Sequence, residues 1–368
     1  NEVSKNETRV AATPESVKFL QTLGLSIVVE KEAGLASGYL DEEYLSVGAK
    51  LAEHSDCLNH ADICLTVLMP SVDDIKELKS NCILIGMLNP FQNIKLVSEL
   101  NNRNITSCCM ELIPRISRAQ NMDVLSSQSN LAGYRSVIDA AAQFCKAFPM
   151  MMTAAGKVNP AKVLVLGTGV AGLQAIATAK RLGAIVSATD VRLATKQQVE
   201  SLGAKFVTVD NREANEAETS EGYAKEMSEE YKIKQAELIK ETISKQDIVI
   251  CTALIPGKSA PILVTKEMVE TMAPGSVIVD LAVEAGGNCP LSKLNERIIH
   301  NNVKIIGYAN VPGRIAKDAS SLYAKNLVNF LSLITDKENK KISIDWEDEI
   351  IKAVVLTHAG KIMLEQFT

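Results

Sequence analysis

The chain has 368 residues, which is too long for one ordinary hydrophobic core and favours two domains. Its formal net charge of −5, with no basic block, argues against a nucleic-acid-binding surface. No apolar run reaches the about eighteen residues that a membrane-spanning helix needs. The eight cysteines show no CxxC spacing, so we expect buried thiols in a reducing compartment and predict no metal site.

Short helical patterns alternate with short apolar segments from Arg9 to about Leu112. Four of these segments are typical of strands: LSIVVE, ADICLTV, NCILIGML and NITSCCMEL. Such alternation predicts a parallel sheet flanked by helices. No glycine fingerprint occurs here, so this first domain is a poor candidate for holding a pyrophosphate group.

A polar segment, 113–129, follows the last of these strands and precedes a long helical pattern. Its side chains have the chemistry of a ligand-binding loop. They are Arg115, Arg118, Gln120, Asp123, Ser126 and Ser127. A second interpretation stays open from the residue types alone, in which the segment is a solvated crossover whose Asp or Ser caps the next helix.

Residues 130–148 carry apolar side chains at helical spacing, and Pro149 ends the pattern. We therefore expect a long helix that connects the first domain to a second one. Three consecutive methionines, Met150 to Met152, follow the proline, and we expect them to pack adaptably at the junction of the two domains.

The stretch KVLVLGTGVAGLQAIATAKRLGAIVSATDVR, from Lys162 to Arg192, carries the most specific signal in the chain. A buried strand pattern breaks at Gly167, Gly169 and Gly172, where a helical pattern begins, as in a dinucleotide-binding turn. The first glycine permits the tight turn, the second lets the backbone approach a pyrophosphate, and the third lets helix and strand touch. The free N–H groups of the helix N-terminus complete an anion site.

A second strand pattern ends at Asp190. A carboxylate there accepts hydrogen bonds from the adenosine ribose hydroxyls and repels a 2′-phosphate, which favours NAD(H) over NADP(H). Arg192, two residues on, weakens that preference. The sheet is predicted to continue through KFVTVD, DIVICTALIPG, GSVIVDLAVEAGGN and VKIIGYANVPG, the last three ending in small-residue loops where ligands bind open α/β sheets.

A long polar interval separates two of these strands. Its part from about 211 to 235 is predicted to be a mobile loop, with Gly222 as a pivot and Tyr223 as an amphipathic tip. A solvated loop without a function is the other interpretation. Further on, the helical pattern of 315–334 is expected to return the chain to the first domain, and Trp346 in the tail is expected to be a packing anchor.

The histidines restrict the chemistry. A dehydrogenase acting on a hydroxy or amino acid needs a positioned base, usually His or Lys. None of the four histidines lies in a carboxyl-edge loop or in 113–129. Hydride transfer between two nicotinamide rings needs no acid or base, only two rings held in contact with water excluded. The segment 113–129, together with a lid, suits this second demand better.

Several long stretches of the chain resemble one family. RVAATPESV, RISRAQNMDVLSSQSNLAGYRSVIDAA, TDVRLATKQQVESLGAKFV, EGYAKEM and DLAVEAGGNCP are similar to the NAD(H)-binding component of proton-translocating nicotinamide nucleotide transhydrogenases, in the wider alanine dehydrogenase and transhydrogenase family. The resemblance covers nearly the whole chain. We therefore expect an α/β fold of two Rossmann-like, doubly wound parallel-sheet domains joined by two long helices, one domain formed by 1–130 with 332–368 and the other by 131–331.

The resemblance implies an oxidoreductase that passes hydride directly from NADH to NADP⁺. NAD(H) would bind this chain, NADP(H) would bind a partner component, and a membrane-spanning component would couple the transfer to proton translocation. The subunit would be a homodimer, peripheral to a membrane through its partners, on the cytoplasmic or organelle-matrix side.

The resemblance also places site residues, position by position. Arg115 and Asp123 would form an ion pair beside the nicotinamide, Ser126 would bind its carboxamide, and Gln120 would reach toward the NADP ring. Tyr223 would be the tip of a lid. The other implied cofactor-binding positions are Arg118; Gly167, Gly169, Val170, Ala171 and Gly172 at the pyrophosphate; Asp190, Val191 and Arg192 at the adenosine; and Gly222, Gln235 and Leu254.

One segment of this chain differs from the corresponding segment of alanine dehydrogenases and so distinguishes the two branches of the family. Alanine dehydrogenases carry a KVKEP-type segment, whose second Lys binds the substrate carboxylate, and a later catalytic His. Here LTVLMP puts Leu68 and Met69 at the Lys and Glu positions, and residues 83–90 contain no His. Transhydrogenase is therefore the preferred hypothesis, with an alanine dehydrogenase and a non-catalytic NAD(H)-binding regulator as the alternatives.

Overall fold

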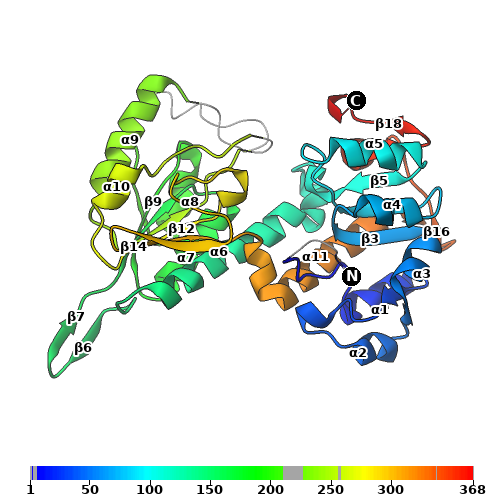
Figure 1. Cartoon of the computed structure of the whole chain (residues 1–368), viewed down its shortest axis with the longest axis horizontal. Helices are drawn as coiled ribbons and strands as arrows, with labels where there is room; N and C mark the ends of the chain where they lie inside the picture. Colours follow the sequence, from blue (N-terminus) through cyan, green and yellow to red (C-terminus); the bar gives the residue numbers. More distant parts are fainter. Residues whose placement is uncertain (1, 3–5, 210–226, 256–257, 337, 368) are drawn as a thin grey trace. The chain divides into compact units, whose positions relative to one another are not determined.

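The computed structural model describes residues 2, 6–209, 227–255, 258–336 and 338–367. The chain forms two compact units, and each is described by itself (Figure 1). Unit 1 consists of Asn1–Gln128 and Pro312–Thr368, and unit 2 of Ser129–Val311. Both units contain strands that pair in parallel, which confirms the predicted α/β fold class.

Unit 2 is organised around a seven-stranded sheet in the order β10-β9-β8-β11-β12-β14-β13. Its strands are β8 Lys162–Leu166, β9 Ile185–Thr189, β10 Lys205–Phe206, β11 Ile248–Cys251, β12 Val277–Asp280, β13 Glu296–His300 and β14 Val303–Gly307. All pair in parallel except the edge strand β13, which the sequence did not reveal. The strand order reverses between β8 and β11, which is the point where open sheets of this kind bind ligands.

Alternate residues of β8 enter two different cores, because successive side chains of a strand point to opposite faces. Val163 and Val165 pack with the helix α7, and Leu164 and Leu166 pack with α9 and α10. Helices therefore cover both faces of this sheet. They are α7 Val170–Arg181, α8 Lys196–Ser201, α9 Glu229–Ile243 and α10 Lys266–Glu270.

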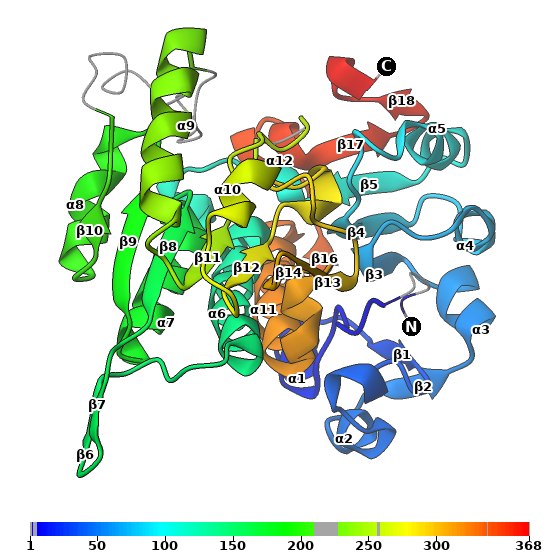
Figure 2. The same ribbon diagram turned by 60° about the vertical axis from the view of Figure 1, so that its left-hand side comes forward.

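The methionine run lies in a hairpin formed by β6 Met151–Thr153 and β7 Gly156–Val158. Figures 1 and 2 show this hairpin extending away from the sheet of its own unit. Met150, Met151 and Met152 are 55, 42 and 70 % exposed. The expectation that these methionines are packed is therefore wrong for the isolated chain.

Unit 1 contains a five-stranded sheet in the order β18-β17-β5-β4-β3. The strands β3 Ile63–Leu68, β4 Ile83–Met87 and β5 Thr106–Cys109 are parallel, as expected. The C-terminal tail adds β17 Val355–His358 and β18 Lys361–Ile362, both antiparallel to their neighbours. The predicted strand LSIVVE contributes only β1 Val28–Glu30, which pairs with β2 Lys50–Ala52 in a separate small sheet.

The long helix α11, Ala316–Leu333, belongs to unit 1, whereas the sequence assigned residues up to 331 to the second domain. Its Leu327 and Phe330 are buried in one core with Val67 and Ile85 of the unit 1 sheet. The other helices of unit 1 are α1 Pro14–Thr22, α2 Asp41–Ser46, α3 His54–Asn59, α4 Val72–Glu77, α5 Ile94–Asn102 and α12 Glu349–Val354. Helix α6, Val124–Gln143, carries the chain from unit 1 into unit 2. Across the described ranges, no helix combines the length and the apolar character that crossing a membrane requires.

Candidate functional site

The glycine turn after β8 has the geometry that its spacing predicts. Gly167 has a φ of +95°, which L side chains rarely adopt, and Gly169 is the N-cap of α7 with a φ of −72°. A Cβ on Gly172 would lie 1.9 Å from the carbonyl oxygen of Gly167, so helix and strand touch there. A Cβ on Gly169 would meet no atom within 4 Å. The turn therefore leaves open space in front of a helix N-terminus, which suits a pyrophosphate.

Asp190 follows β9 directly, and its carboxylate is almost fully buried beside the turn. Thr168 donates to Oδ2 from its backbone N at 2.7 Å and from Oγ1 at 3.0 Å. Arg192 donates to Oδ1 from its backbone N and Nε, both at 2.9 Å, and to Oδ2 from Nη2 at 2.8 Å. Burial raises the pKa of Asp190, but the hydrogen bonds and charge of Arg192 outweigh burial and hold this pKa below its ordinary value.

The four N–H groups among these donors already match the about four lone-pair sites of the carboxylate. The sequence predicted Asp190 as a ribose acceptor but gave no sign that Thr168 and Arg192 already occupy it. A ribose hydroxyl can bind Asp190 only by displacing one of these donors. Arg192 is the donor with a flexible side chain, so its guanidinium is the group that would move.

The segment after β11 is attached to the same turn. Thr252 donates from Oγ1 to the carbonyl oxygens of Leu166 at 3.2 Å and Gly167 at 3.0 Å. The structure thus brings the segment that leads to Leu254, 46 % exposed, against the glycine fingerprint. The sequence placed Thr252 in a carboxyl-edge loop but gave no sign of this contact, which joins positions 85 residues apart.

Two further positions predicted in unit 2, Val191 and Gln235, lie near or on α9. Gln235 is half-buried on α9. Val191 packs against the buried side chains of Met227 and Tyr231 at the start of this segment. Gly222 and Tyr223 lie outside the described residues, as does most of the predicted lid.

The polar segment of unit 1 forms the 3-10 helix η3, Ser117–Met122, and then enters α6. Asp123 accepts from the backbone N of Ser126 at 2.8 Å and from its Oγ at 2.5 Å. Asp123 therefore caps α6, as the second interpretation of this segment proposed, and α6 begins six residues earlier than expected. A cap of this kind also fixes the positions of both side chains.

Arg118 makes a forked contact within unit 1. Its Nη1 and Nη2 donate to the two carboxylate oxygens of Asp348 at 2.9 and 2.8 Å, and Nε donates to Glu349 at 3.2 Å. Arg118 thereby ties η3 to the N-terminus of α12, a role that the sequence did not reveal. Arg115 and Gln120 are exposed on the same segment.

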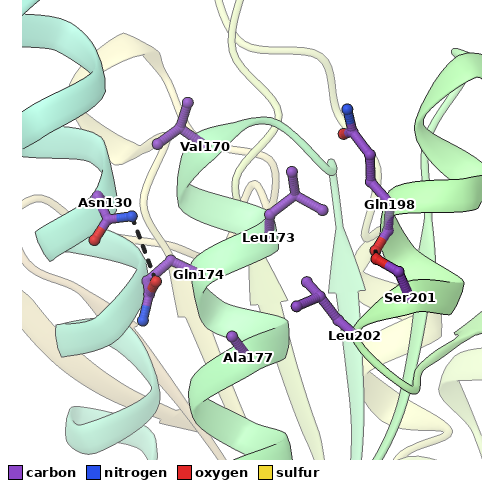
Figure 3. Close-up of a pocket in the computed structure, with 8 residues that line it drawn as sticks. All are labelled: Asn130, Val170, Leu173, Gln174, Ala177, Gln198, Ser201 and Leu202. Carbon is purple, nitrogen blue, oxygen red and sulfur yellow. Dashed lines mark hydrogen bonds between the residues drawn. The ribbon is translucent and has the colours of Figure 1, made fainter.

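A shallow groove of about 370 Å³ runs along α7 on its side toward α6 and α8 (Figure 3). Leu173, Ala177 and Leu202 form its apolar part, and Asn130 donates to Gln174 at its rim at 3.4 Å. Val170 is the one predicted cofactor residue among the side chains that line it. The glycines of the turn and Asp190 are not among the residues that line this groove.

The described histidines serve other contacts. His54 lies between Glu30 and Asp74, with both of its ring nitrogens 2.9 Å from a carboxylate oxygen. His358 packs against Trp346, with ring centroids 4.0 Å apart and the ring planes tilted by 36°. Within the described ranges, no group of three His, Cys, Asp or Glu side chains is arranged to hold a metal ion.

Comparison with known proteins identifies the family. Residues 1–132 match the model of the alanine dehydrogenase/PNT N-terminal domain, and residues 136–365 match that of the C-terminal domain. The chain belongs to the alanine dehydrogenase/PNT family. This confirms the resemblance seen in the sequence.

Within this family the chain is more similar to transhydrogenases than to alanine dehydrogenases. It is 54 % identical to an NAD(P) transhydrogenase alpha subunit of Rhodospirillum rubrum over 97 % of this chain and 94 % of that protein. A crystal structure of transhydrogenase from Sinorhizobium meliloti is 50 % identical, with a TM-score of 0.90 and 98 % of both chains covered. An alanine dehydrogenase of Methanococcus maripaludis is 29 % identical over 94 % of this chain and 88 % of that protein.

The segment LTVLMP of unit 1 contacts an acidic side chain in the structure. Met69 is buried, and the backbone N–H groups of Val67 and Leu68 donate to the carboxylate of Glu2 at 2.7 and 3.1 Å. Burial raises the pKa of Glu2 to about 7 despite these two hydrogen bonds. The carboxyl group of Glu2 therefore occupies this strand end, which disfavours binding of a substrate carboxylate here.

Proposed function

We propose that this chain is the NAD(H)-binding component of a proton-translocating NAD(P) transhydrogenase, which passes hydride from NADH to NADP⁺ held on a partner component. The observation that carries the proposal is the glycine turn with Asp190 beside it, in a chain 54 % identical to a transhydrogenase alpha subunit. A membrane-spanning component would couple the transfer to proton translocation, and this chain would be peripheral to the membrane.

The residues of the chain divide the work of holding the cofactor. The α7 N-terminus, with Gly169, Val170 and Ala171, would bind the pyrophosphate, and Asp190 would bind the adenosine ribose. When bound, NADH supplies the hydride. In unit 1, Ser126 would bind the carboxamide and Gln120 would set the distance to the acceptor ring. Positioning of this kind needs no proton transfer, which fits a segment without a histidine or lysine.

We propose that the chain works as a homodimer. The exposed methionines of the β6–β7 hairpin support this, because a projecting apolar surface of this kind usually marks an interaction site. Sedimentation of the chain should give twice its monomer mass of 39.8 kDa. Met152→Lys at the hairpin should shift the species toward monomer, whereas Lys157→Arg on the facing strand should not.

The decisive experiment is a hydride-transfer assay with an NADP-binding partner. The chain, the partner, NADH and a spectrally distinct NADP⁺ analogue should oxidise one NADH for each analogue reduced, and Gln120→Asn should slow this transfer while NADH still binds. NADH production from L-alanine by the chain alone would establish the dehydrogenase alternative. NADH binding without transfer to a competent partner would instead indicate the regulator.

A further inference from the structure

We propose that Asn288 is a positioning residue for the nicotinamide half of NAD(H), because its buried carboxamide fixes the Thr252–Leu254 backbone beside the glycine turn. The inference rests on the proposed function. Asn288 has no exposed surface and is not among the cofactor-binding positions that the resemblance implies. It follows β12, in the stretch DLAVEAGGNCP.

The carboxamide of Asn288 pairs with the backbone of Ala253 in both directions. Nδ2 donates to the carbonyl oxygen of Ala253 at 2.9 Å, and Oδ1 accepts from the N–H of Ala253 at 3.1 Å. Nδ2 also donates to the carbonyl oxygen of Pro261 at 2.8 Å. An amide side chain offers two donors and one acceptor group, and all of them are used here. One side chain thus holds the segment after β11 at two separate points.

The backbone of Asn288 is itself fixed by Asp280, the last residue of β12, which has no exposed surface. Oδ1 of Asp280 accepts from the backbone N of Ala282 at 3.0 Å and of Asn288 at 3.2 Å. Oδ2 accepts from the backbone N of Cys289 at 3.1 Å and from Ser292 Oγ at 2.7 Å. Four donors compensate the buried carboxylate, so the turn that presents Asn288 is rigid.

The segment that Asn288 holds borders the ligand site. A Cβ on Gly167 would lie 3.1 Å from the backbone N of Ala253, and Thr252 donates to the carbonyl oxygen of Gly167. With the adenosine at Asp190 after β9 and the pyrophosphate at the β8 turn, the dinucleotide runs across the switch point toward β11 and β12. The nicotinamide half therefore lies on the Ala253 side, where Leu254 is exposed.

If Asn288 positions the nicotinamide half, its loss should affect NADH and ADP-ribose differently, whereas a merely structural role predicts equal effects. Asn288→Asp keeps the shape of the side chain but replaces the Nδ2 donor by an oxygen atom, which accepts. That oxygen would face the carbonyl oxygens of Ala253 and Pro261, so both carbonyl groups must move away. The adenosine and pyrophosphate contacts involve other residues. The variant should therefore lose affinity for NADH and keep its affinity for ADP-ribose, which lacks the nicotinamide ring.

The test compares the Kd values of NADH and ADP-ribose for the full chain and its variants by calorimetry, together with kcat and KM for transfer to the partner. For Asn288→Asp we expect a loss of about tenfold in NADH affinity, a change below about twofold for ADP-ribose, and a loss of kcat larger than the rise in KM. Val249→Ala is the matched control, because it removes buried volume from β11 without touching these hydrogen bonds.

Equal losses of affinity for both ligands, or the same pattern in Val249→Ala, would overturn the inference. Should Asn288→Asp not fold, Asn288→Ala removes the same bonds without adding a charge, and the ratio of the two Kd values answers the same question. Failure of the proposed function would be seen differently, as a wild-type chain that does not bind NADH or does not transfer hydride.

Discussion

Substitution of Gly172 by alanine should destabilise unit 2 whether or not a cofactor is bound. The added Cβ would lie 1.9 Å from the carbonyl oxygen of Gly167 and 2.9 Å from its carbonyl carbon. A Cβ essentially never lies closer than 3.0 Å to another heavy atom in a folded protein. Helix α7 must therefore retreat from the turn by about 1.1 Å, and the nearest atoms belong to the backbone, so no flexible side chain can absorb that movement.

The size of the effect follows from this forced movement. Overpacking of a well-packed site costs about 1–3 kcal/mol, and a clash between two backbone segments belongs at the upper end. Alanine is favoured over glycine within a helix by about 1 kcal/mol, which offsets some of that cost. A net loss of about 2 kcal/mol lowers the Tm of a unit of this size by about 4–8 °C.

Gly169→Ala is the matched control, because its Cβ would meet no atom within 4 Å and its φ of −72° suits alanine. Loss of a glycine N-cap should cost below about 1 kcal/mol, so calorimetry should show a nearly unchanged Tm. NADH affinity should nevertheless fall about tenfold, since the new methyl group fills the space in front of the helix N-terminus. A normal Tm for Gly172→Ala, or unchanged NADH affinity for Gly169→Ala, would refute these assignments.

Three further substitutions address other regions of the chain. Asp190→Asn should weaken NADH binding about tenfold and reduce the preference for NADH over NADPH, measured by titration; an unchanged preference would remove Asp190 from the ribose site. Asp123→Asn keeps an oxygen that can cap α6 but loses the negative charge. Hydride transfer to the partner should therefore slow far more than NADH binding weakens. A loss confined to NADH affinity would contradict this. His54, whose pKa is raised by hydrogen bonds to its two carboxylate partners, should stabilise unit 1 below its ordinary pKa of 6.5 and lose that effect as pH rises through the raised value. Urea unfolding should therefore show that the free energy of unfolding differs between wild type and His54→Gln, and that this difference shrinks as the pH rises. The difference should stay below about 1 kcal/mol, because the His54 ring is 37 % exposed. A difference that grows with pH would refute this.

The sequence revealed those features of the site that depend on local spacing. One strand, one turn and one helix fix the intervals between Gly167, Gly169 and Gly172. Their pattern is therefore visible within a short stretch of sequence. Contacts between distant segments leave no such pattern: Thr252 docks on the turn from 85 residues away, and Asn288 holds Ala253 from 35 residues away. Sequence reasoning could find the turn but not what keeps it in place.

The fold, too, could be predicted only where it depends on local sequence patterns. The parallel strands β3 and β4 lie in apolar stretches of the sequence, and the tail pattern suggested a short strand hairpin, or a strand and a helix, but not that its strand β17 pairs with β5. Periodicity placed the start of α6 too late because the first turn, after Asp123, carries the polar residues of a capped helix end. Its helical character was hidden by the chemistry that made the segment resemble a binding loop.

The ion pair between Asp190 and Arg192 changes how cofactor preference should be understood. A carboxylate near the ribose is usually taken to select NAD(H) by accepting from the hydroxyls and repelling a 2′-phosphate. Here the guanidinium occupies the acceptor oxygens and neutralises the charge, so in the paired state Asp190 can do neither. If Asp190 binds the ribose as proposed, discrimination would begin only when the guanidinium leaves the carboxylate, and its strength would depend on where Arg192 goes. The displaced guanidinium of Arg192 would attract a 2′-phosphate, whereas the carboxylate of Asp190 would repel it. Because the two residues are only two positions apart, these opposite effects would act on the same phosphate.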